Sequence, residues 1–186
     1  MKRPTGDEQG VFLALDFGGT NVRVSRIRLL GKHCYVIEKK IARPLRLSGK
    51  YDYTTEETTK DELFDFLADC VAAVAGRNSS YKLGHTFSFA VRQDGPQDAQ
   101  FSAWAKEIRV QGMEGVMIND ALRQALLRRG LDHIEPVALL NDTTAALLAA
   151  SYQQDNAMVG IICGTGYNMR IPGNFSCPFR RYPVMI

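Results

Sequence analysis

The segment Leu15–Arg23 (LDFGGTNVR) constrains the fold most, because it places a carboxylate at the end of an apolar run and follows it with two glycines. The run Val11–Asp16 predicts a buried strand, and Gly18 with Gly19 predicts a sharp turn. Glycines lack a Cβ, so the backbone N–H groups of such a turn can approach phosphate oxygens. A glycine hairpin beside a capping aspartate is common, but the complete pattern Asp-x-Gly-Gly-Thr-Asn-x-Arg indicates a phosphate-binding turn.

Polar residues beside the two glycines add to this interpretation. Thr20 and Asn21 can donate further hydrogen bonds to phosphate oxygens. Asp16 can hold a hydrated Mg²⁺ ion, because this ion prefers oxygen ligands and keeps several of its waters. The turn is therefore a candidate site for the phosphates of a nucleotide and their magnesium ion.

The N-terminal part of the chain predicts three consecutive strands. Val11–Asp16 is followed by Asn21–Leu29 and His33–Ile41, in which apolar residues alternate with polar ones or form short runs. The first turn contains Gly18-Gly19 and the second contains Gly31-Lys32, as expected where the backbone bends sharply or takes a positive φ. We expect an antiparallel meander.

The rest of the chain alternates between helical and strand patterns after a loop at about Arg43–Lys60. The expected elements are a helix from Asp61 to Val74, a strand Tyr81–Val91, a helix Met117–Arg129, a strand Pro136–Leu140, a helix Thr143–Tyr152 and a strand Met158–Cys163. Three antiparallel strands followed by alternating helices and parallel strands predict an α/β, ribonuclease-H-like fold with a mixed five-stranded sheet.

Composition excludes several classes of function. The 23 basic and 20 acidic residues are scattered, so no nucleic-acid partner is indicated. Cys34, Cys70, Cys163 and Cys177 are far apart, which suggests free thiols rather than a zinc site or disulfide framework. The start of the chain is polar and no apolar run approaches the roughly 20 residues that cross a bilayer, so we expect no membrane partner and a cytoplasmic protein.

Two further motifs carry chemistry. In Leu140-Asn141-Asp142-Thr143 a strand end meets a helix start, and Asp142 could act as a general base toward a hydroxyl group. Taken alone, the same residues favour Asp142 as a helix N-cap. The segment Gly164–Asn168 (GTGYN) can form a second backbone cradle for phosphate, although a Gly-x-Gly turn is weak by itself.

The order of these parts resembles the actin-like ATPase superfamily, in which a phosphate loop, a strand-end aspartate and a second phosphate loop recur. Within it, Leu83–Gln93 (LGHTFSFAVRQ) resembles the sugar segment of the hexokinase family, which usually reads Gly-Phe-Thr-Phe-Ser-Phe-Pro and then x-Arg-Gln or x-Gln. The resemblance runs from about Phe12 to Asn168 and covers the N-terminal portion of hexokinases and glucokinases only.

This resemblance implies ATP-dependent phosphorylation of a glucose-like hexose at its 6-hydroxyl, as in glycolysis, with ATP and Mg²⁺ as cofactors. Asp142 would be the catalytic base. The sugar would be bound by Ser88, Lys106, Asn141, Asp142 and Asn168. The ATP phosphates would be bound by Asp16, Gly18, Gly19, Thr20, Asn21, Arg23, Gly164, Thr165 and Gly166, with Asp16 holding the metal through water.

Two departures from the family pattern leave an alternative open. Ala90 stands where the family has proline, and Ala105 stands where it usually has a threonine before the lysine. A sugar-binding sensor or regulator that kept the fold without catalysis would tolerate such changes. The aromatic residues Phe87 and Phe89 could face a sugar, but alternating aromatics in a strand favour the core.

The resemblance also implies a division of the chain into two lobes. Residues 1–140 would form the small lobe, and 141–186 the hinge and the beginning of the large lobe. The apolar end Val184–Ile186 looks like the start of a strand, so we expect a truncated chain that binds hexose weakly and has little kinase activity alone. The preferred hexose and the oligomeric state stay open.

Overall fold

A mixed five-stranded sheet organises the chain. The computed structural model describes residues 3–76, 79–105, 107–154, 156–163 and 167–171. The sheet has the strand order β3-β2-β1-β6-β9, formed by β1 (Gln9–Phe17), β2 (Asn21–Gly31), β3 (Cys34–Pro44), β6 (Tyr81–Phe87) and β9 (Ile134–Leu140). The first three strands are antiparallel, whereas β6 runs parallel to β1 and β9 parallel to β6. The predicted ribonuclease-H-like plan is confirmed.

The two turns of the meander differ in their backbone. At the second turn Gly31, Lys32 and His33 have φ values of 73°, 52° and 61°, which confirms the expected left-handed backbone there. At the first turn the N–H of Gly18 donates to the carbonyl of Asn21 over 3.1 Å, and Gly18 keeps a negative φ. The first turn is therefore tight without any requirement for a left-handed glycine at position 18.

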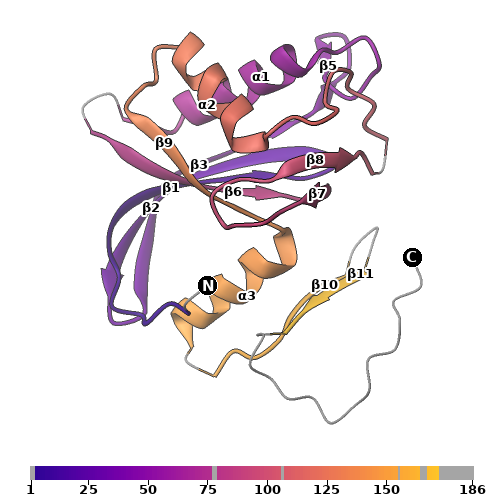
Figure 1. Cartoon of the computed structure of the whole chain (residues 1–186). Helices are drawn as coiled ribbons and strands as arrows, with labels where there is room; N and C mark the ends of the chain where they lie inside the picture. Colours follow the sequence, from indigo (N-terminus) through magenta and orange to yellow (C-terminus); the bar gives the residue numbers. More distant parts are fainter. Residues whose placement is uncertain (1–2, 77–78, 106, 155, 164–166, 172–186) are drawn as a thin grey trace, which may run out of the picture.

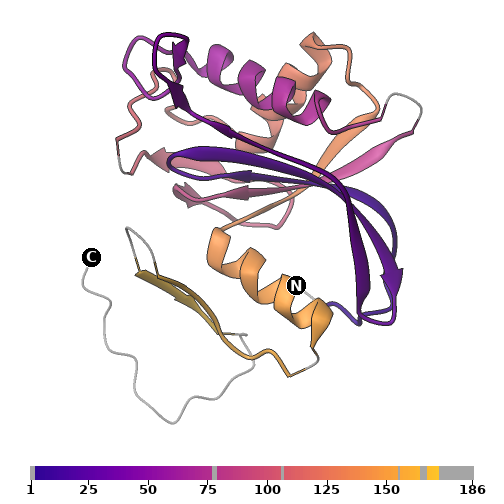
Figure 2. The same cartoon turned by 180° about the vertical axis from the view of Figure 1, so that it is seen from behind.

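Helices cover both faces of the sheet (Figures 1 and 2). On one face lie α1 (Lys60–Ala72) and α2 (Ile118–Arg128), and on the other lies α3 (Asp142–Gln153). Thr59 begins α1 with a capping box in which the Thr59 and Glu62 side chains bond each other's backbone N–H groups. On the outer side, Arg128 pairs with Asp65 at 2.6 Å and thereby joins α2 to α1.

The main core lies between the sheet and the first two helices. Strand residues alternate, so that one set of side chains faces the helices and packs against their apolar stripes. The largest fully buried side chains are Phe17, Phe64, Phe87, Leu13, Leu15, Leu45, Leu63, Leu67, Leu83, Met113, Ile118 and Leu122. At about 25 cal/mol per Å² of buried apolar surface, this cluster supplies much of the driving force for folding.

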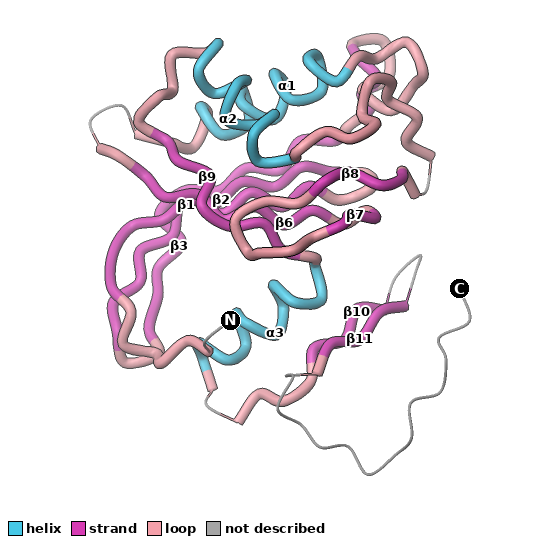
Figure 3. The backbone as a smooth tube through the Cα atoms, viewed as in Figure 1, coloured by secondary structure: helices cyan, strands magenta, loops and turns pink. Residues whose placement is uncertain are grey.

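Short hairpins lie outside the main sheet. They are β4 (Arg46–Leu47) with β5 (Tyr51–Asp52), β7 (Ala90–Arg92) with β8 (Gln100–Ala103), and β10 (Gly160–Cys163) with β11 (Tyr167–Arg170). Figure 3 shows that the β10–β11 hairpin lies beside α3. Two expectations were wrong in detail. The segment predicted as a loop at Arg43–Lys60 contains the β4–β5 hairpin, and the strand predicted as Tyr81–Val91 breaks after Phe87, because Val91 pairs with Phe101 instead of continuing the main ladder.

The first strand of the sheet order, β3, has no neighbour on its outer side within the described residues. Tyr35, Val36 and Ile37 in its first half are 43–48% exposed, and exposed Lys39 and Lys40 follow in its second half. Its pairing with β2 shifts register between Arg26 and Ile27. This edge therefore changes from apolar to charged along its length.

Two other expectations concern thiols and membranes. Cys34, Cys70 and Cys163 are free thiols, as predicted, and Cys177 lies outside the described residues. Among the helices that the structure describes, none combines the length and apolar character needed to cross a bilayer.

Candidate active site

The predicted site residues follow the ends of three adjacent parallel strands. Asp16 on β1, Thr86 on β6 and Leu140 on β9 are register partners across the sheet. Because the carboxyl ends of parallel strands meet at one edge, the glycine turn, Ser88 and the Asn141-Asp142 pair all leave the sheet at this edge. The topology explains why residues from distant parts of the sequence gather there.

At the glycine turn, Gly18 has an unstrained backbone and there is room for a Cβ at its position. A Cβ built on Gly18 would meet its nearest neighbour, the carbonyl oxygen of Asn21, at an ordinary 3.5 Å. The turn is fixed from outside by the Leu45 N–H, which donates to the Thr20 carbonyl over 2.9 Å. A cavity of about 400 Å³ borders Gly19, Thr20 and Asn21. The fold itself therefore does not require the glycine, whereas a phosphate approaching the backbone would.

Asp16 and Arg23 form an ion pair beside this turn. They are register partners on β1 and β2, and the Nη1 of Arg23 lies 3.1 Å from Oδ2 of Asp16. The side chains are 40% and 58% exposed, so the pair contributes little to stability. No group of three His, Cys, Asp or Glu side chains arranged for a metal occurs in the described part. A single accessible carboxylate suits Mg²⁺, which is commonly held by one or two carboxylates together with substrate phosphates and water.

Asn141, Asp142 and Asn168 come together where β9 meets α3. The N-cap of α3 is Asn141, whose Oδ1 accepts from the Thr143 N–H at 3.0 Å and from Nδ2 of Asn168 at 3.2 Å. Asp142 is the first helical residue instead of the cap, so the alternative assignment of Asp142 as N-cap is wrong. Its Oδ1 accepts from the Thr143 N–H at 2.7 Å, and Oδ2 makes no hydrogen bond to the described residues. One carboxylate oxygen thus stays available to accept a proton.

Ser88 leaves β6 next to the glycine turn. Its N–H donates to the carbonyl of Phe17 over 3.3 Å, and its side chain is half-buried. Phe87 and Phe89 on either side of it are 1% and 6% exposed, which confirms that both belong to the core. Trp104 packs edge-on against Phe89, with ring centroids 4.9 Å apart, and its Nε1 donates to the Val110 carbonyl at 2.9 Å. This aromatic cluster fixes the backbone that presents Ser88.

Four of the predicted site residues, Lys106 and Gly164–Gly166, lie outside the described residues. The others form two groups. Asp16 and Arg23 accompany the glycine turn, and Asn141, Asp142 and Asn168 form the second cluster. Ser88 is attached to the first group through its backbone bond to Phe17.

Sequence reasoning missed a buried polar network behind the site. His85 and Asn119 are each 1% exposed, and Nδ1 of His85 lies 3.1 Å from Oδ1 of Asn119. The available signal was the segment Gly84-His85-Thr86, in which a histidine stands at the first phenylalanine of the Gly-Phe-Thr-Phe-Ser-Phe-Pro pattern. Nothing local in the sequence pointed to Asn119, which comes from α2.

Because His85 is buried, we expect the protein to lose stability as the pH is lowered. Burial lowers its pKa from 6.5 to about 4, against a smaller opposing effect of the Asn119 hydrogen bond. Between these values the unfolded chain binds more protons, so the stabilisation is complete above pH 6.5 and is lost as pH falls toward 4, by about 3 kcal/mol in all. Urea denaturation at pH 7 and pH 4.5 measures it. His85→Phe is expected to flatten this pH dependence, and an unchanged slope in that variant would contradict the assignment.

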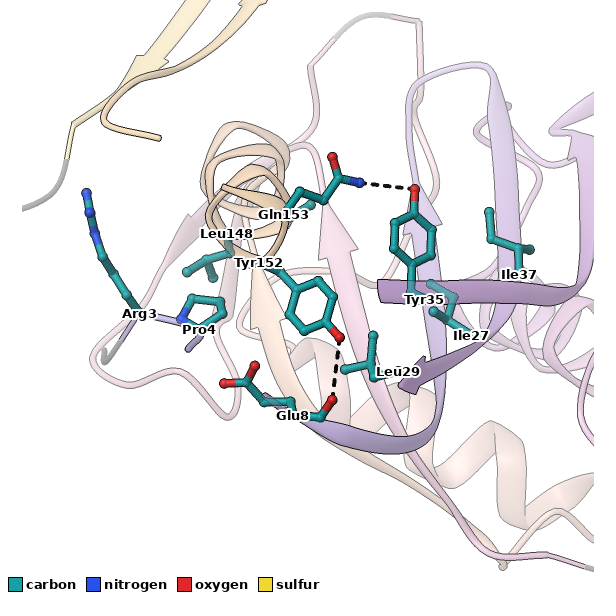
Figure 4. A pocket seen from close by; sticks show the side chains of 11 residues that line it. Arg3, Pro4, Glu8, Ile27, Leu29, Tyr35, Ile37, Leu148, Tyr152 and Gln153 are labelled. Carbon is teal, nitrogen blue, oxygen red and sulfur yellow. Dashed lines mark hydrogen bonds between the residues drawn. The ribbon is translucent and has the colours of Figure 1, made fainter. Parts of the chain in front are cut away.

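A larger cavity, of about 670 Å³, lies away from the strand ends (Figure 4). Its walls come from the N-terminal segment, β2, β3 and α3, and they include none of the predicted site residues. Figure 4 shows the Tyr152 hydroxyl directed at the backbone of Glu8 and the Gln153 amide directed at Tyr35, over 3.4 and 3.1 Å. These contacts tie the end of α3 to the first residues of the chain and to β3.

The mixed sheet, with a glycine turn after β1 and an Asn-Asp pair after β9, defines an actin-like α/β protein. The family model described as hexokinase matches residues 1–152, and the chain belongs to the hexokinase family. It is 34% identical to Hexokinase-1 of Schizosaccharomyces pombe, covering 89% of this chain and 34% of that protein. It is 36% identical to human Hexokinase HKDC1, covering 89% of this chain and 18% of that protein.

Solved structures agree with this assignment. A crystal structure of a hexokinase matches with a TM-score of 0.80 and 35% identity, over 90% of this chain and 40% of that one. The hexokinase of Schistosoma mansoni complexed with glucose matches with a TM-score of 0.75 and 31% identity, over 90% of this chain and 37% of that one. The chain therefore spans about a third of the length of Hexokinase-1 of S. pombe and about a fifth of the length of human Hexokinase HKDC1.

Proposed function

We propose that the protein transfers the γ-phosphoryl group of ATP to the 6-hydroxyl of a glucose-like hexose, with Asp142 as the catalytic base. The observation that carries this proposal is the cluster of Asn141, Asp142 and Asn168 at the end of β9, at the same sheet edge as the glycine turn. Membership of the hexokinase family and the glucose bound by the S. mansoni hexokinase support a hexose as the acceptor.

Each residue of the cluster has a role that its contacts suit. Oδ2 of Asp142, which has no hydrogen bond to any residue that the structure describes, would accept the proton of the attacking hydroxyl, while Oδ1 is held by the Thr143 N–H. The amides of Asn141 and Asn168 and the hydroxyl of Ser88 supply the several convergent donors and acceptors that bind a small polyol. Lys106 would add a charged donor to the same sugar.

The glycine turn is proposed to bind the phosphates of ATP. The Gly18 N–H is already bonded to the Asn21 carbonyl, so the proposed donors are the Gly19 N–H with Thr20, Asn21 and Arg23, while Gly18 leaves room for the phosphate because it has no Cβ. Gly164–Gly166 would form the second cradle. Asp16 would hold Mg²⁺ through water, and the ion would supply positive charge to neutralise the phosphates. Residues 1–140 and 141–186 would belong to two lobes that close around the sugar, in a cytoplasmic protein of glycolysis.

A sensor without catalysis is the second candidate. Ala90 and Ala105 are both exposed; Ala90 departs from the proline of the family's sugar segment, and Ala105 departs from the threonine that usually precedes the family's lysine. A site with these two changes could still bind hexose after it had lost the ability to transfer a phosphoryl group. Asp142, with its available oxygen, argues for the kinase.

An ADP-release assay separates the two candidates. ATP, Mg²⁺ and a panel of hexoses are supplied to the 186-residue chain and to the longest product of the same gene. Hexose-dependent ADP release supports the kinase, whereas hexose binding with no ADP release in either form supports the sensor. The expectation of little activity from these 186 residues alone is tested in the same experiment.

Gly18→Ala is expected to weaken ATP binding without unfolding the protein. The added Cβ meets only the Asn21 carbonyl at 3.5 Å, and φ is not in the left-handed region, so the free energy of unfolding should change by less than about 1 kcal/mol. The same methyl group occupies space that a phosphate needs. Urea denaturation together with ATP titration measures both effects, and unchanged ATP affinity would remove this turn from the phosphate site.

A further inference from the structure

A buried polar pair joins β6 to α2 behind the candidate site. Burying an imidazole and an amide is costly unless both are hydrogen-bonded, and an apolar pair would fill the same space without that cost. His85 and Asn119 meet at 3.1 Å in the core, with Phe87 edge-on to the imidazole at 5.8 Å. Such a pair fixes orientation more effectively than it adds stability.

The hydrogen bonds give the pair a direction. Nδ2 of Asn119 donates to the carbonyl of Gln97 over 2.6 Å, so its Oδ1 must face His85 and accept from Nδ1–H. Nε2 of the buried imidazole has no partner among the described residues, so a second ring proton there would be unsatisfied and the neutral form is favoured. Asn119 thereby links β6 to the loop between β7 and β8.

This loop, residues 93–99, is fastened at several further points. The side chain of Gln93 donates to the Leu139 carbonyl, and the Leu139 N–H donates to the Pro96 carbonyl, each over 2.8 Å. Asp98 accepts from the backbone N–H groups of Asn119 at 2.7 Å and Asp120 at 3.0 Å. Leu139 is the register partner of His85 and lies two residues before Asn141. The loop is thus anchored to β6, β9 and α2 together.

The same loop joins the two strands of the β7–β8 hairpin, which lies along the front of the sheet in Figure 1. β7 begins at Ala90, two residues after Ser88, and β8 leads into Trp104. Trp104 packs against Phe89 at 4.9 Å and Phe17 at 6.3 Å. Because Trp104 also packs against Phe87 at 6.3 Å, the hairpin contacts the sugar segment on both sides of Ser88.

We propose that His85 and Asn119 are positioning residues that hold the β7–β8 hairpin against the ends of β6 and β9 and so set hexose affinity. This inference rests on the proposed hexose site but not on phosphoryl transfer. The pair touches no reacting atom, so it acts through the hairpin and should affect binding more than the chemical step.

The test compares His85→Phe, Asn119→Leu and the double variant with wild type. Each single change leaves one buried partner unpaired and should lower stability, whereas the double change pairs two apolar groups and should recover most of it. The double variant still lacks the donor to Gln97. We expect its Leu139 amide to exchange hydrogen about three- to tenfold faster, and hexose to bind about three- to tenfold more weakly.

Two readouts keep the outcome independent of catalysis. Trp104 is the single tryptophan of these 186 residues, so a hexose-dependent change in the emission of this chain would come from the hairpin. In the longest gene product the KM for hexose should rise while kcat changes by less than about twofold. Val71→Ala in α1, which is fully buried and remote from the loop, is the control for general loss of stability.

The outcomes are distinct. Wild-type exchange at Leu139 and wild-type hexose affinity in the double variant would overturn the proposal. So would an equal loss of hexose affinity in Val71→Ala, or the absence of any hexose-dependent change in Trp104 emission. A further outcome is that hexose binding weakens in the double variant while neither the 186-residue chain nor the longest gene product releases ADP. That result would support the positioning role and refute the kinase.

Discussion

Asp142→Asn is expected to lower hexose phosphorylation by about 100- to 10,000-fold, the usual contribution of a positioned general base. The substituted amide keeps the size of the carboxylate and can still accept from the Thr143 N–H through its oxygen. It cannot take the proton of the attacking hydroxyl. Since a base acts mainly in the transition state, hexose affinity should change far less than turnover.

The measurement is kcat with the longest gene product, beside hexose titration of Trp104 emission. Asp120→Asn is the matched control, because Asp120 is also an acidic residue in the first turn of a helix, with an ion pair to Arg123. Turnover in that control should equal wild type. If Asp142→Asn keeps full turnover, or if Asp120→Asn falls equally, Asp142 loses its role as base.

Gly160→Ala is expected to separate β10 from α3 and to weaken hexose binding at least tenfold. A Cβ on Gly160 would lie 2.8 Å from the Thr143 carbonyl oxygen, 2.9 Å from Cβ of Leu147 and 3.2 Å from its backbone nitrogen. These are atoms of a helix that cannot move individually, so the hairpin must shift. The shift removes Asn168 from Asn141 and costs about 1–3 kcal/mol of stability, as overpacking does.

Gly84→Ala provides the comparison for this effect. Gly84 is also a strand glycine with a negative φ, but a Cβ there would meet no atom within 4 Å. Thermal denaturation and hexose titration of Trp104 emission should therefore remain near wild type in Gly84→Ala and change in Gly160→Ala. Equal behaviour of the two variants would mean that contact between β10 and α3 does not place Asn168.

Local patterns predicted the elements well because burial on one face imposes its period on the sequence. The helical spacing from Leu63 to Val74 and the alternation in Asn21–Leu29 reflect side chains that do face the core. The break after Phe87 was not predictable, since Ser88-Phe89-Ala90-Val91 continues to read as strand. Only the tertiary pairing of Val91 with Phe101 ends the first strand there.

The sequence predicted individual site residues better than the contacts between residues that are distant in the sequence. Asn141 and Asp142 are both favoured cap residues, and the extended backbone at Asn141, with φ −70° and ψ 151°, decides between them. The link between His85 and Asn119 spans 34 positions of sequence and depends on how α2 crosses the sheet. No period or spacing in the sequence carries that information.

The β3 edge has a consequence for the behaviour of the purified chain. A strand edge with free N–H and C=O groups is a template on which other strands can add, and native sheets resist this with lysines and bulges. Here Lys39, Lys40 and the register shift beside Ile27 protect one half, while Tyr35–Ile37 offer an exposed apolar template in the other. Aggregation in concentrated solution would therefore begin at Tyr35–Ile37, and a charged side chain at Val36 would oppose it where the natural edge has none.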